Sequence, residues 1–275
     1  LMESLGNKRR IWAPEPKYSL VEKYQRIKPN ELITVAGPCS IEDEDQIIVT
    51  AAFLGSFGIK FMRGGIYRAG TYPGDNFGFI YKALIRSFKN HANNNNMGCV
   101  LEVLDYSPAG FDIYKKYADV FQIGARQMQN YKMLQIVAKD GRPVFLKRNM
   151  GSNLHEFLGA AEYLLKNGTK DLTLIERGSS TFMDHVRWDL SISIIPVLHK
   201  ITNIPIIVDA SHGTGRSDLV APMTYAGIAA GADGYLIEVH PSPELSISDR
   251  DQALSFKEFE EINRNINKLK EWRKK

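Results

Sequence analysis

The stretch PIIVDASHGTGRSDLVAPMTYAGIAAGADGYLIEVH, residues 205–240, contains the pattern that decides the fold. An apolar run at Pro205–His212 is followed by a segment with helical spacing at Leu219–Ala230 and by a second apolar run at Gly234–His240. Runs that are apolar throughout are typical of parallel strands that are covered on one face and packed on the other. This stretch is therefore predicted to form a strand–helix–strand unit.

The same alternation extends through most of the 275 residues. Further helices are predicted at Asp43–Phe57, Leu154–Lys166 and Phe256–Trp272. The eight apolar runs are Leu32–Cys39, Lys60–Ile66, Cys99–Asp105, Val120–Ala125, Pro143–Asn149, Leu172–Gly178, Pro205–His212 and Gly234–His240. Eight strand–helix units predict an α/β fold of the (β/α)8 TIM-barrel type, which typically needs ~250 residues. A doubly wound open sheet is the alternative, because alternation alone does not show closure.

Residues 1–30 precede this repeat and show little periodicity. They contain Pro14, Pro16 and Pro29. We interpret them as a short N-terminal extension that covers the base of the barrel or contacts another subunit, and as too short for a regulatory domain. Residues 31–275 are predicted to form a single barrel domain.

The composition argues against several classes of protein. The chain has 35 basic and 31 acidic residues, but much of the excess lies in Lys8–Arg10 and Lys268–Lys275, so no basic stripe for nucleic acid is evident. No apolar run approaches the ~20 residues of a membrane span. The two cysteines, Cys39 and Cys99, form no disulfide framework and suit a reducing compartment. We therefore expect a cytoplasmic protein that binds neither nucleic acid nor membrane.

Active sites of such barrels lie at the carboxyl ends of the strands. Four potential metal ligands occur there, namely Cys39, His212, Glu238 and Asp249, and barrel closure would bring their strands side by side. Sulfur, nitrogen and oxygen ligands together suit a divalent Mn, Fe, Co or Zn ion better than Mg or Ca. For Cys39 alone a buried apolar role would be favoured, but four converging ligand types reverse that preference. His240 is a further candidate, either as a ligand or as a residue that supports one.

A second set of strand-end residues is basic and consists of Arg63, Arg126, Lys147, Arg148 and Arg177. Five cations at one mouth repel one another unless an anion with several charges lies among them. Arginine is suited to bidentate contacts with phosphate and carboxylate, so we predict a compact ligand that carries both groups. Ion pairing with Glu102, Glu176 and Asp209 is the alternative explanation.

Six motifs follow one another along the chain, one per strand. They are Ala36-Gly37-Pro38-Cys39-Ser40, Gln122-Ile123-Gly124-Ala125-Arg126 with Gln129-Asn130, Leu146-Lys147-Arg148, Glu176-Arg177-Gly178, Asp209-Ala210-Ser211-His212 and Glu238-Val239-His240-Pro241. Their order resembles that of the 3-deoxy-heptulosonate 7-phosphate (DAHP) synthases, in particular the short type I-beta branch that also includes 3-deoxy-octulosonate 8-phosphate synthase. Each motif alone is weak, but six in this order are specific.

The resemblance implies a transferase that condenses phosphoenolpyruvate with an aldose phosphate, erythrose 4-phosphate, in the first step of aromatic amino-acid (shikimate) biosynthesis. It implies that Cys39, His212, Glu238 and Asp249 bind the metal. It also implies substrate contacts from Arg63, Arg126, Lys147, Arg148, Arg177 and Thr71, and catalytic roles for Lys147, Arg68 and Glu102. Family members are often tetramers, so we expect a homo-oligomer, with a tetramer as the favoured form.

One segment departs from the family pattern. Arg68-Ala69-Gly70-Thr71 stands where heptulosonate enzymes carry Lys-Pro-Arg-Thr or Ser, so Gly70 replaces the arginine that holds the phosphate of erythrose 4-phosphate. Octulosonate enzymes have Lys-Ala-Asn-Arg-Ser here, so neither pattern fits. The same chemistry with a different aldose acceptor is therefore an alternative, and a non-catalytic barrel that binds an anionic metabolite is a second one.

Overall fold

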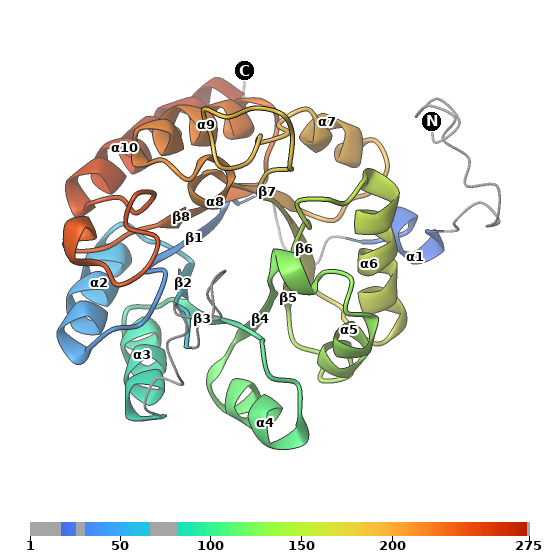
Figure 1. Ribbon diagram of the computed structural model, residues 1–275, viewed down its shortest axis with the longest axis horizontal. Coiled ribbons are helices and arrows are strands. Elements are labelled where there is room, and N and C mark those ends of the chain that lie inside the picture. The colour runs from blue at the N-terminus through green and yellow to red at the C-terminus, as the bar shows by residue number, and fades with distance from the viewer. Residues whose placement is uncertain (1–17, 26–30, 67–81, 274–275) are drawn as a thin grey trace.

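The computed structural model describes residues 18–25, 31–66 and 82–273. Eight parallel strands pair in chain order, and β1 also pairs with β8, so the sheet is a closed barrel (Figure 1). The strands are β1 (Ile33–Gly37), β2 (Phe61–Arg63), β3 (Gly98–Glu102), β4 (Val120–Ile123), β5 (Val144–Lys147), β6 (Leu172–Glu176), β7 (Ile206–Asp209) and β8 (Gly234–Glu238). Seven of these strands lie within predicted apolar runs, and β3 begins one residue before its run, at Gly98. The TIM barrel is confirmed, and closure excludes the open sheet.

Helices surround the barrel and alternate with its strands (Figure 1). They are α1 (Ser19–Glu22), α2 (Glu44–Ser56), α3 (Lys82–Asn94), α4 (Pro108–Tyr117), α5 (Tyr131–Ala138), α6 (Leu154–Lys166), α7 (Ile194–His199), α8 (Ala210–Thr214), α9 (Ser217–Ala229) and α10 (Phe256–Arg273). The four helices predicted from the sequence correspond to α2, α6, α9 and α10. None of the described helices is both long enough and apolar enough to cross a membrane.

Local capping explains where two of these helices begin. The Asp43 side chain accepts a hydrogen bond from the backbone nitrogen of Gln46 (2.7 Å) at the start of α2. Asn153 and Glu156 form a reciprocal capping box at the start of α6. Such caps satisfy backbone N–H groups that have no partner within the helix.

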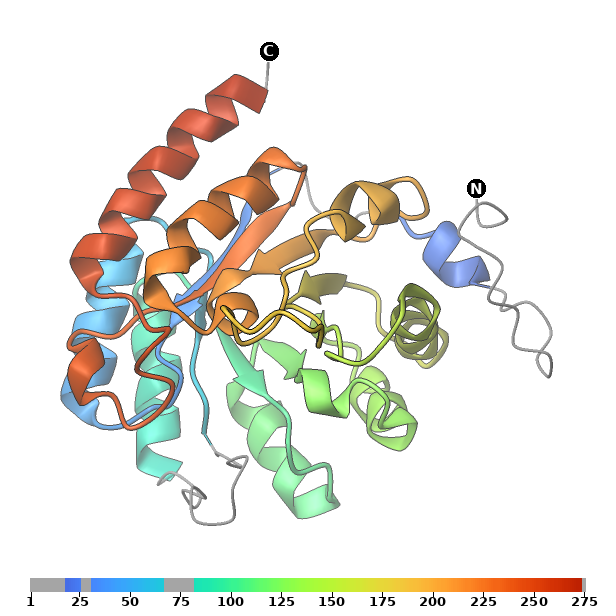
Figure 2. The ribbon, with the colours of Figure 1, turned by 45° about the horizontal axis from the view of Figure 1, so that its top comes forward.

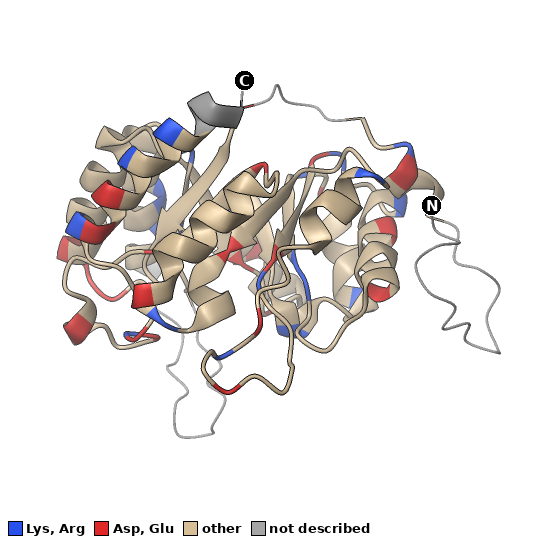
Figure 3. Cartoon of the chain, turned by 90° about the horizontal axis from the view of Figure 1, so that it is seen from above, with Lys and Arg blue, Asp and Glu red and all other residues tan. Residues whose placement is uncertain are grey.

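The last helix closes the outer ring. Figure 2 shows α10 running beside α9. The ring of Phe256 at its first turn stacks on Phe53 of α2, with 4.0 Å between ring centroids. Basic and acidic residues are interspersed along the described part of α10 (Figure 3). This mixture of both signs is typical of a solvated face.

The described part of the N-terminal extension, residues 18–25, packs beside α6. The Tyr18 hydroxyl donates to the carbonyl of His155 (2.9 Å), and Glu162 accepts hydrogen bonds from the backbone nitrogens of Leu20 and Val21. The Tyr24 hydroxyl accepts from the backbone nitrogen of Leu172, the first residue of β6 (3.2 Å). This segment therefore contacts the amino-terminal end of the barrel, opposite the strand ends that carry the predicted site.

The barrel interior determines which side chains face the site. A buried apolar layer consists of Val35, Val100, Val120, Phe145, Ile175, Ile207 and Leu236. Side chains two positions apart on a strand share a face. The next inward positions toward the carboxyl ends are Gly37, Glu102, Gln122, Lys147, Arg177, Asp209 and Glu238. An apolar floor is therefore followed directly by a layer that is mostly polar and charged.

Candidate active site

A pocket opens at the carboxyl-terminal end of the barrel. The predicted residues that line it are Cys39, Arg63, Glu102, Arg126, Lys147, Arg177, His212 and Asp249. Arg68 and Thr71 lie outside the described residues. Most of the predicted metal and anion sets thus face one cavity.

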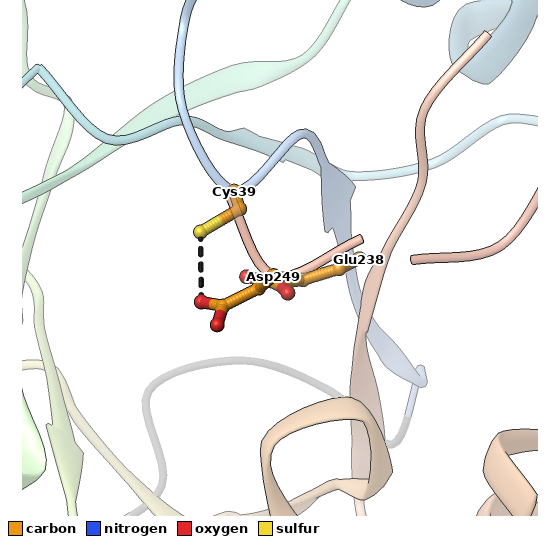
Figure 4. A group of neighbouring side chains, drawn as sticks. All are labelled: Cys39, Glu238 and Asp249. Atoms are coloured by element: carbon orange, nitrogen blue, oxygen red, sulfur yellow. Dashed lines mark hydrogen bonds between the residues drawn. The ribbon is translucent and has the colours of Figure 1, made fainter. Parts of the chain in front are cut away.

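Three of the four predicted metal ligands converge. The ligand atoms of Cys39, Glu238 and Asp249 all lie within 4.8 Å of one another (Figure 4). The Cys39 thiol donates to Oδ2 of Asp249 at 3.1 Å. Asp249 has φ of 48°, a left-handed conformation that is uncommon for a residue other than glycine. This conformation belongs to the loop that carries the Asp249 carboxylate to Cys39.

His212, the fourth predicted ligand, adjoins this group through Glu238. Its Nε2 lies 3.2 Å from Oε1 of Glu238, and its Nδ1 lies 2.8 Å from Oδ2 of Asp209. A carboxylate on one ring nitrogen fixes the orientation of the imidazole and directs the other nitrogen. Asp209 therefore holds His212 with Nε2 toward the group of three.

The chemistry of this group fits a divalent ion. Burial raises the pKa of the Cys39 thiol well above its usual range, and Glu238 and Asp249 raise it further, while Arg63 opposes them. Acidic groups packed this closely repel one another unless protons or a cation lie among them. A cation would lower the thiol pKa and allow thiolate, imidazole and carboxylate to bind together.

The Glu238 carboxylate is held on both oxygens. Oε1 accepts from Arg63 (2.8 Å), whose NH1 also donates to the carbonyl of Pro38 (2.7 Å). Oε2 accepts from Nε2 of Gln252 (2.6 Å). Gln252 was not predicted, because its amide side chain is neither a typical metal ligand nor a cation. It supports a predicted ligand directly.

Three of the five predicted cations form buried ion pairs, one of which is the pair of Arg63 with Glu238 described above. Nζ of Lys147 lies 2.9 Å from Oδ2 of Asp209, and Nε of Arg148 lies 3.1 Å from Oε2 of Glu176. Burial alone would raise the pKa of Asp209, but His212 and Lys147 lower it well below its usual range. Strand-end carboxylates therefore neutralise part of the basic set, as the alternative explanation proposed from the sequence requires.

Arg148 is not among the residues that line the pocket. It follows Lys147 directly, and successive side chains on a strand point to opposite faces. Besides Glu176, its guanidinium donates to the hydroxyl of Ser179. The structure therefore places Arg148 where it supports the loop after β6, away from the substrate position expected for it.

Arg177 shows the features of a ligand-binding cation. Its guanidinium lies over the Trp188 ring, 5.4 Å from the centroid, and its buried NH1 has no hydrogen-bond partner among the residues that the structure describes. Burial lowers the pKa of Arg177 to about 10; Asp209 opposes this shift, whereas Arg187 and Arg126 add to it. A buried donor without a partner calls for an explanation, and an anionic ligand supplies one.

Glu102 and His240 occupy different surroundings. Glu102 faces the pocket, and its Oε2 accepts from Nε2 of Gln122 (3.1 Å). His240 turns away from the metal group, because its Nδ1 accepts from the backbone nitrogen of Ser242 and its Nε2 lies 3.4 Å from Glu42. His240 therefore joins two loops and is not placed as a ligand.

Sequence comparison adds to this geometry. Residues 22–275 match the sequence model of the DAHP synthetase I family. The chain belongs to this family. The resemblance expected from the strand-end motifs is thereby confirmed, as is the class of enzyme.

Relatives within and near the DAHP synthetase I family cover most of the chain. A phospho-2-dehydro-3-deoxyheptonate aldolase from Thermotoga maritima is 40% identical over 237 residues, which is 86% of this chain and 69% of the relative. A 2-dehydro-3-deoxyphosphooctonate aldolase from Desulfotalea psychrophila is 26% identical, with 87% of this chain and 90% of the relative covered.

Solved structures of DAHP synthases show the same fold. The crystal structure of the Thermotoga maritima enzyme has a TM-score of 0.82 at 39% identity and covers 86% of this chain and 69% of that chain. A truncated form of 3-deoxy-D-arabino-heptulosonate 7-phosphate synthase from the same organism has a TM-score of 0.80 at 38% identity, with 87% of each chain covered.

Two further pocket features of this DAHP synthetase I chain come from the loop between β6 and α7. Arg187 lines the pocket, and Trp188 stacks under Arg177. Neither Arg187 nor Trp188 belongs to one of the strand-end motifs. Pocket residues that lie in loops cannot be predicted from the strand ends, because their direction depends on how the loop folds back over the barrel.

Proposed function

We propose that this protein condenses phosphoenolpyruvate with erythrose 4-phosphate to give 3-deoxy-heptulosonate 7-phosphate and phosphate. The names of the Thermotoga maritima relatives and the family support this activity. The observation that carries the proposal is that potential metal ligands and anion-binding cations lie together at one pocket. A group of thiol and carboxylate ligands adjoins a set of cations, of which Lys147 and Arg177 are buried.

The cations bind phosphoenolpyruvate in this proposal. Arg126, Lys147 and Arg177 line the pocket and would contact its phosphate and carboxylate. Arg177 gains a partner for its NH1, and Asp209 holds Lys147 in place. Charge-assisted contacts of this kind orient the substrate and stabilise the phosphate as it leaves.

Cys39, His212, Glu238 and Asp249 would hold a divalent ion of the Mn, Fe, Co or Zn class. Bound there, the ion supplies Lewis-acid activation of the aldehyde oxygen. C3 of phosphoenolpyruvate forms a bond to the aldehyde carbon, water adds at C2 and phosphate departs.

Glu102, directed into the pocket by Gln122, is the residue we propose to accept a proton from that water. Lys147 keeps the catalytic role implied by the family. That role is electrostatic, through its position beside Asp209 and His212.

The acceptor is the part of the proposal with a specific alternative. Arg68-Ala69-Gly70-Thr71, which departs from the family pattern, lies outside the described residues, and this departure favours a different aldose as the second candidate. Phosphate release from phosphoenolpyruvate should therefore be measured against erythrose 4-phosphate, arabinose 5-phosphate, ribose 5-phosphate and erythrose. We expect the fastest turnover with erythrose 4-phosphate.

Two cysteine variants make a matched pair for the same assay. Cys39→Ser should abolish phosphate release because it removes a metal ligand. Cys99→Ser should retain it because Cys99 is buried in the core beside α3 and away from the pocket. No phosphate release with any aldose, in the presence of Mn or Co, would sink the proposed function.

We also propose a homo-oligomer, with a tetramer as the expected form, as in many family members. Size-exclusion chromatography with light scattering tests this, and a monomeric mass would contradict it. We also propose a cytoplasmic location, which the cysteine content supports.

A further inference from the structure

Arg187 reaches the pocket from the loop between β6 and α7, and this loop is pinned in place. The backbone nitrogen of Arg187 donates to the carbonyl of Thr214 (2.8 Å), and that of Trp188 donates to the carbonyl of Gly213 (3.0 Å). Both carbonyls belong to α8, which also carries His212 into the pocket. The backbone of Arg187 is therefore positioned as firmly as the helix that it contacts.

Arg187 differs in depth from Arg63 and Lys147, two other cations of the pocket. Its side chain is 37% exposed, whereas the side chains of Arg63 and Lys147 are 5% and 4% exposed. The pocket thus has buried cations at its floor and the exposed guanidinium groups of Arg126 and Arg187 at its rim. A ligand group that binds Arg187 would lie at the rim of the pocket, on the side of Asp249.

Arg187 also differs from them in how tightly it is paired. Its NH1 lies 3.4 Å from Oδ1 of Asp249 and 3.5 Å from Oε1 of Gln252. Arg63 and Lys147 have carboxylate partners at 2.8 Å and 2.9 Å. Long, partly exposed ion pairs contribute little free energy. The guanidinium can therefore exchange these contacts for a phosphate, which accepts a bidentate pair of shorter bonds.

The proposed reaction brings two phosphate groups into one pocket. The aldehyde of the acceptor must lie beside Cys39, Glu238 and Asp249, and its phosphate is attached to the opposite terminal carbon. That end points away from the floor, toward the rim. Arg187 contacts Asp249 and stands at the rim, so it lies on the side of the pocket that the acceptor occupies.

We propose that Arg187 binds the phosphate of the aldose acceptor and makes the enzyme prefer phosphorylated over unphosphorylated aldoses. This inference rests on the proposed function. It concerns a specificity-determining residue, and its effect depends on the presence of the acceptor phosphate.

The test removes the guanidinium and the phosphate separately. With saturating phosphoenolpyruvate, kcat/KM is measured for erythrose 4-phosphate and for erythrose in the unmodified protein, Arg187→Gln and Arg187→Lys. Arg187→Gln should lower kcat/KM for erythrose 4-phosphate roughly 10- to 100-fold, the effect of losing hydrogen bonds between charged groups. Its kcat/KM for erythrose should change little. Arg187→Lys keeps the positive charge but loses the bidentate guanidinium. Its kcat/KM for erythrose 4-phosphate should therefore lie between that of Arg187→Gln and that of the unmodified protein.

Arg264→Gln is the charge control, because Arg264 is an exposed residue of α10 paired with Glu260. It should leave both acceptors unaffected. Thermal unfolding of Arg187→Gln checks that the variant is folded. The Kd for Mn of the same variant, measured by calorimetry, checks that the metal group containing Asp249 is intact. Both should match the unmodified protein.

Several results would overturn the inference. Equal losses for the two acceptors would mean that Arg187 acts through Asp249 or through the loop. No loss for erythrose 4-phosphate would mean that Arg187 does not touch its phosphate. If the unmodified protein had the same kcat/KM for erythrose as for erythrose 4-phosphate, the inference would be refuted but the proposed function would not. A lack of phosphate release with every aldose would refute the proposed function, and the inference with it.

Discussion

At the level of single residues, the buried guanidinium of Arg177 combines a binding role with an energetic cost. Burial lowers its pKa to about 10 from the usual 12.5. A depressed pKa in a base means that the charged form is disfavoured in the folded state at every pH below that value. The corresponding cost at neutral pH is on the order of 3 kcal/mol. Binding an anion offsets this cost, which is why such a residue suits a substrate pocket.

Arg177→Met should therefore stabilise the protein and abolish binding of phosphoenolpyruvate. Scanning calorimetry at pH 7 should show an unfolding midpoint raised by several degrees, although loss of the contact with Trp188 reduces the gain. The gain should shrink as the pH rises through about 10, where the unmodified side chain loses its proton. Phosphoenolpyruvate should raise the midpoint of the unmodified protein only. A lower midpoint for the variant at pH 7 would contradict this account.

Gln252 is a residue whose role is visible only in the folded molecule. It is 2% exposed, and its amide holds Oε2 of Glu238 at 2.6 Å. Gln252→Leu should weaken Mn binding about 10- to 100-fold, as expected when a partner of a metal ligand is removed. Titration calorimetry measures this, and Gln135→Leu on the exposed face of α5 is the control. An unchanged Kd would show that Glu238 needs no such support.

At the level of elements, the end of β1 depends on a glycine. Gly37 pairs in register with Glu238 of β8 and has φ of 148°. A Cβ at this position would lie 2.1 Å from the carbonyl oxygen of Arg63. Strands β1 and β2 can approach this closely under the pocket only because no side chain stands between them. The same approach places Arg63 beside Glu238.

Gly37→Ala should destabilise the barrel more than Gly58→Ala. Gly58 also has a positive φ, of 67°, but a Cβ there meets nothing within 4 Å, so its variant should cost only about 1–2 kcal/mol. Gly37→Ala adds a clash with backbone, and we expect about 3 kcal/mol or more. Urea unfolding followed by circular dichroism compares the two. Equal costs would mean that β1 and β2 can shift apart freely.

At the level of the whole molecule, the site is assembled by closure of the barrel. Cys39 and Asp249 are separated by 210 positions in the chain and lie in hydrogen-bond contact. A ligand that binds such a site stabilises the fold, because the site does not exist in the unfolded chain.

Chelation should lower the unfolding temperature and stop phosphate release. Addition of Mn or Co should restore both, and Cys39→Ser should show no response of the unfolding temperature to either ion. Differential scanning fluorimetry with and without chelator measures the effect on stability. Activity that persists after complete removal of metal would contradict the proposed role of the Cys39, Glu238 and Asp249 group.

The sequence by itself determined the order of elements and much of the site. Helix starts such as Asn153 with Glu156 are local, since the interacting groups are three residues apart. Apolar runs that end in polar residues predicted the strand ends at which the site lies, because such runs are typical of parallel strands. Cys39, Glu238 and Asp249 could therefore be grouped once a closed barrel was assumed.

Only the tertiary structure decided which side chains contact one another around the pocket. It brought Arg187 to the pocket and Gln252 to Glu238, both from loops. Closure between β1 and β8 was likewise not readable from alternation. The physical reason is the same in each case. These contacts join residues far apart in the chain, and their geometry depends on the packing of the whole barrel, which no local pattern of residues encodes.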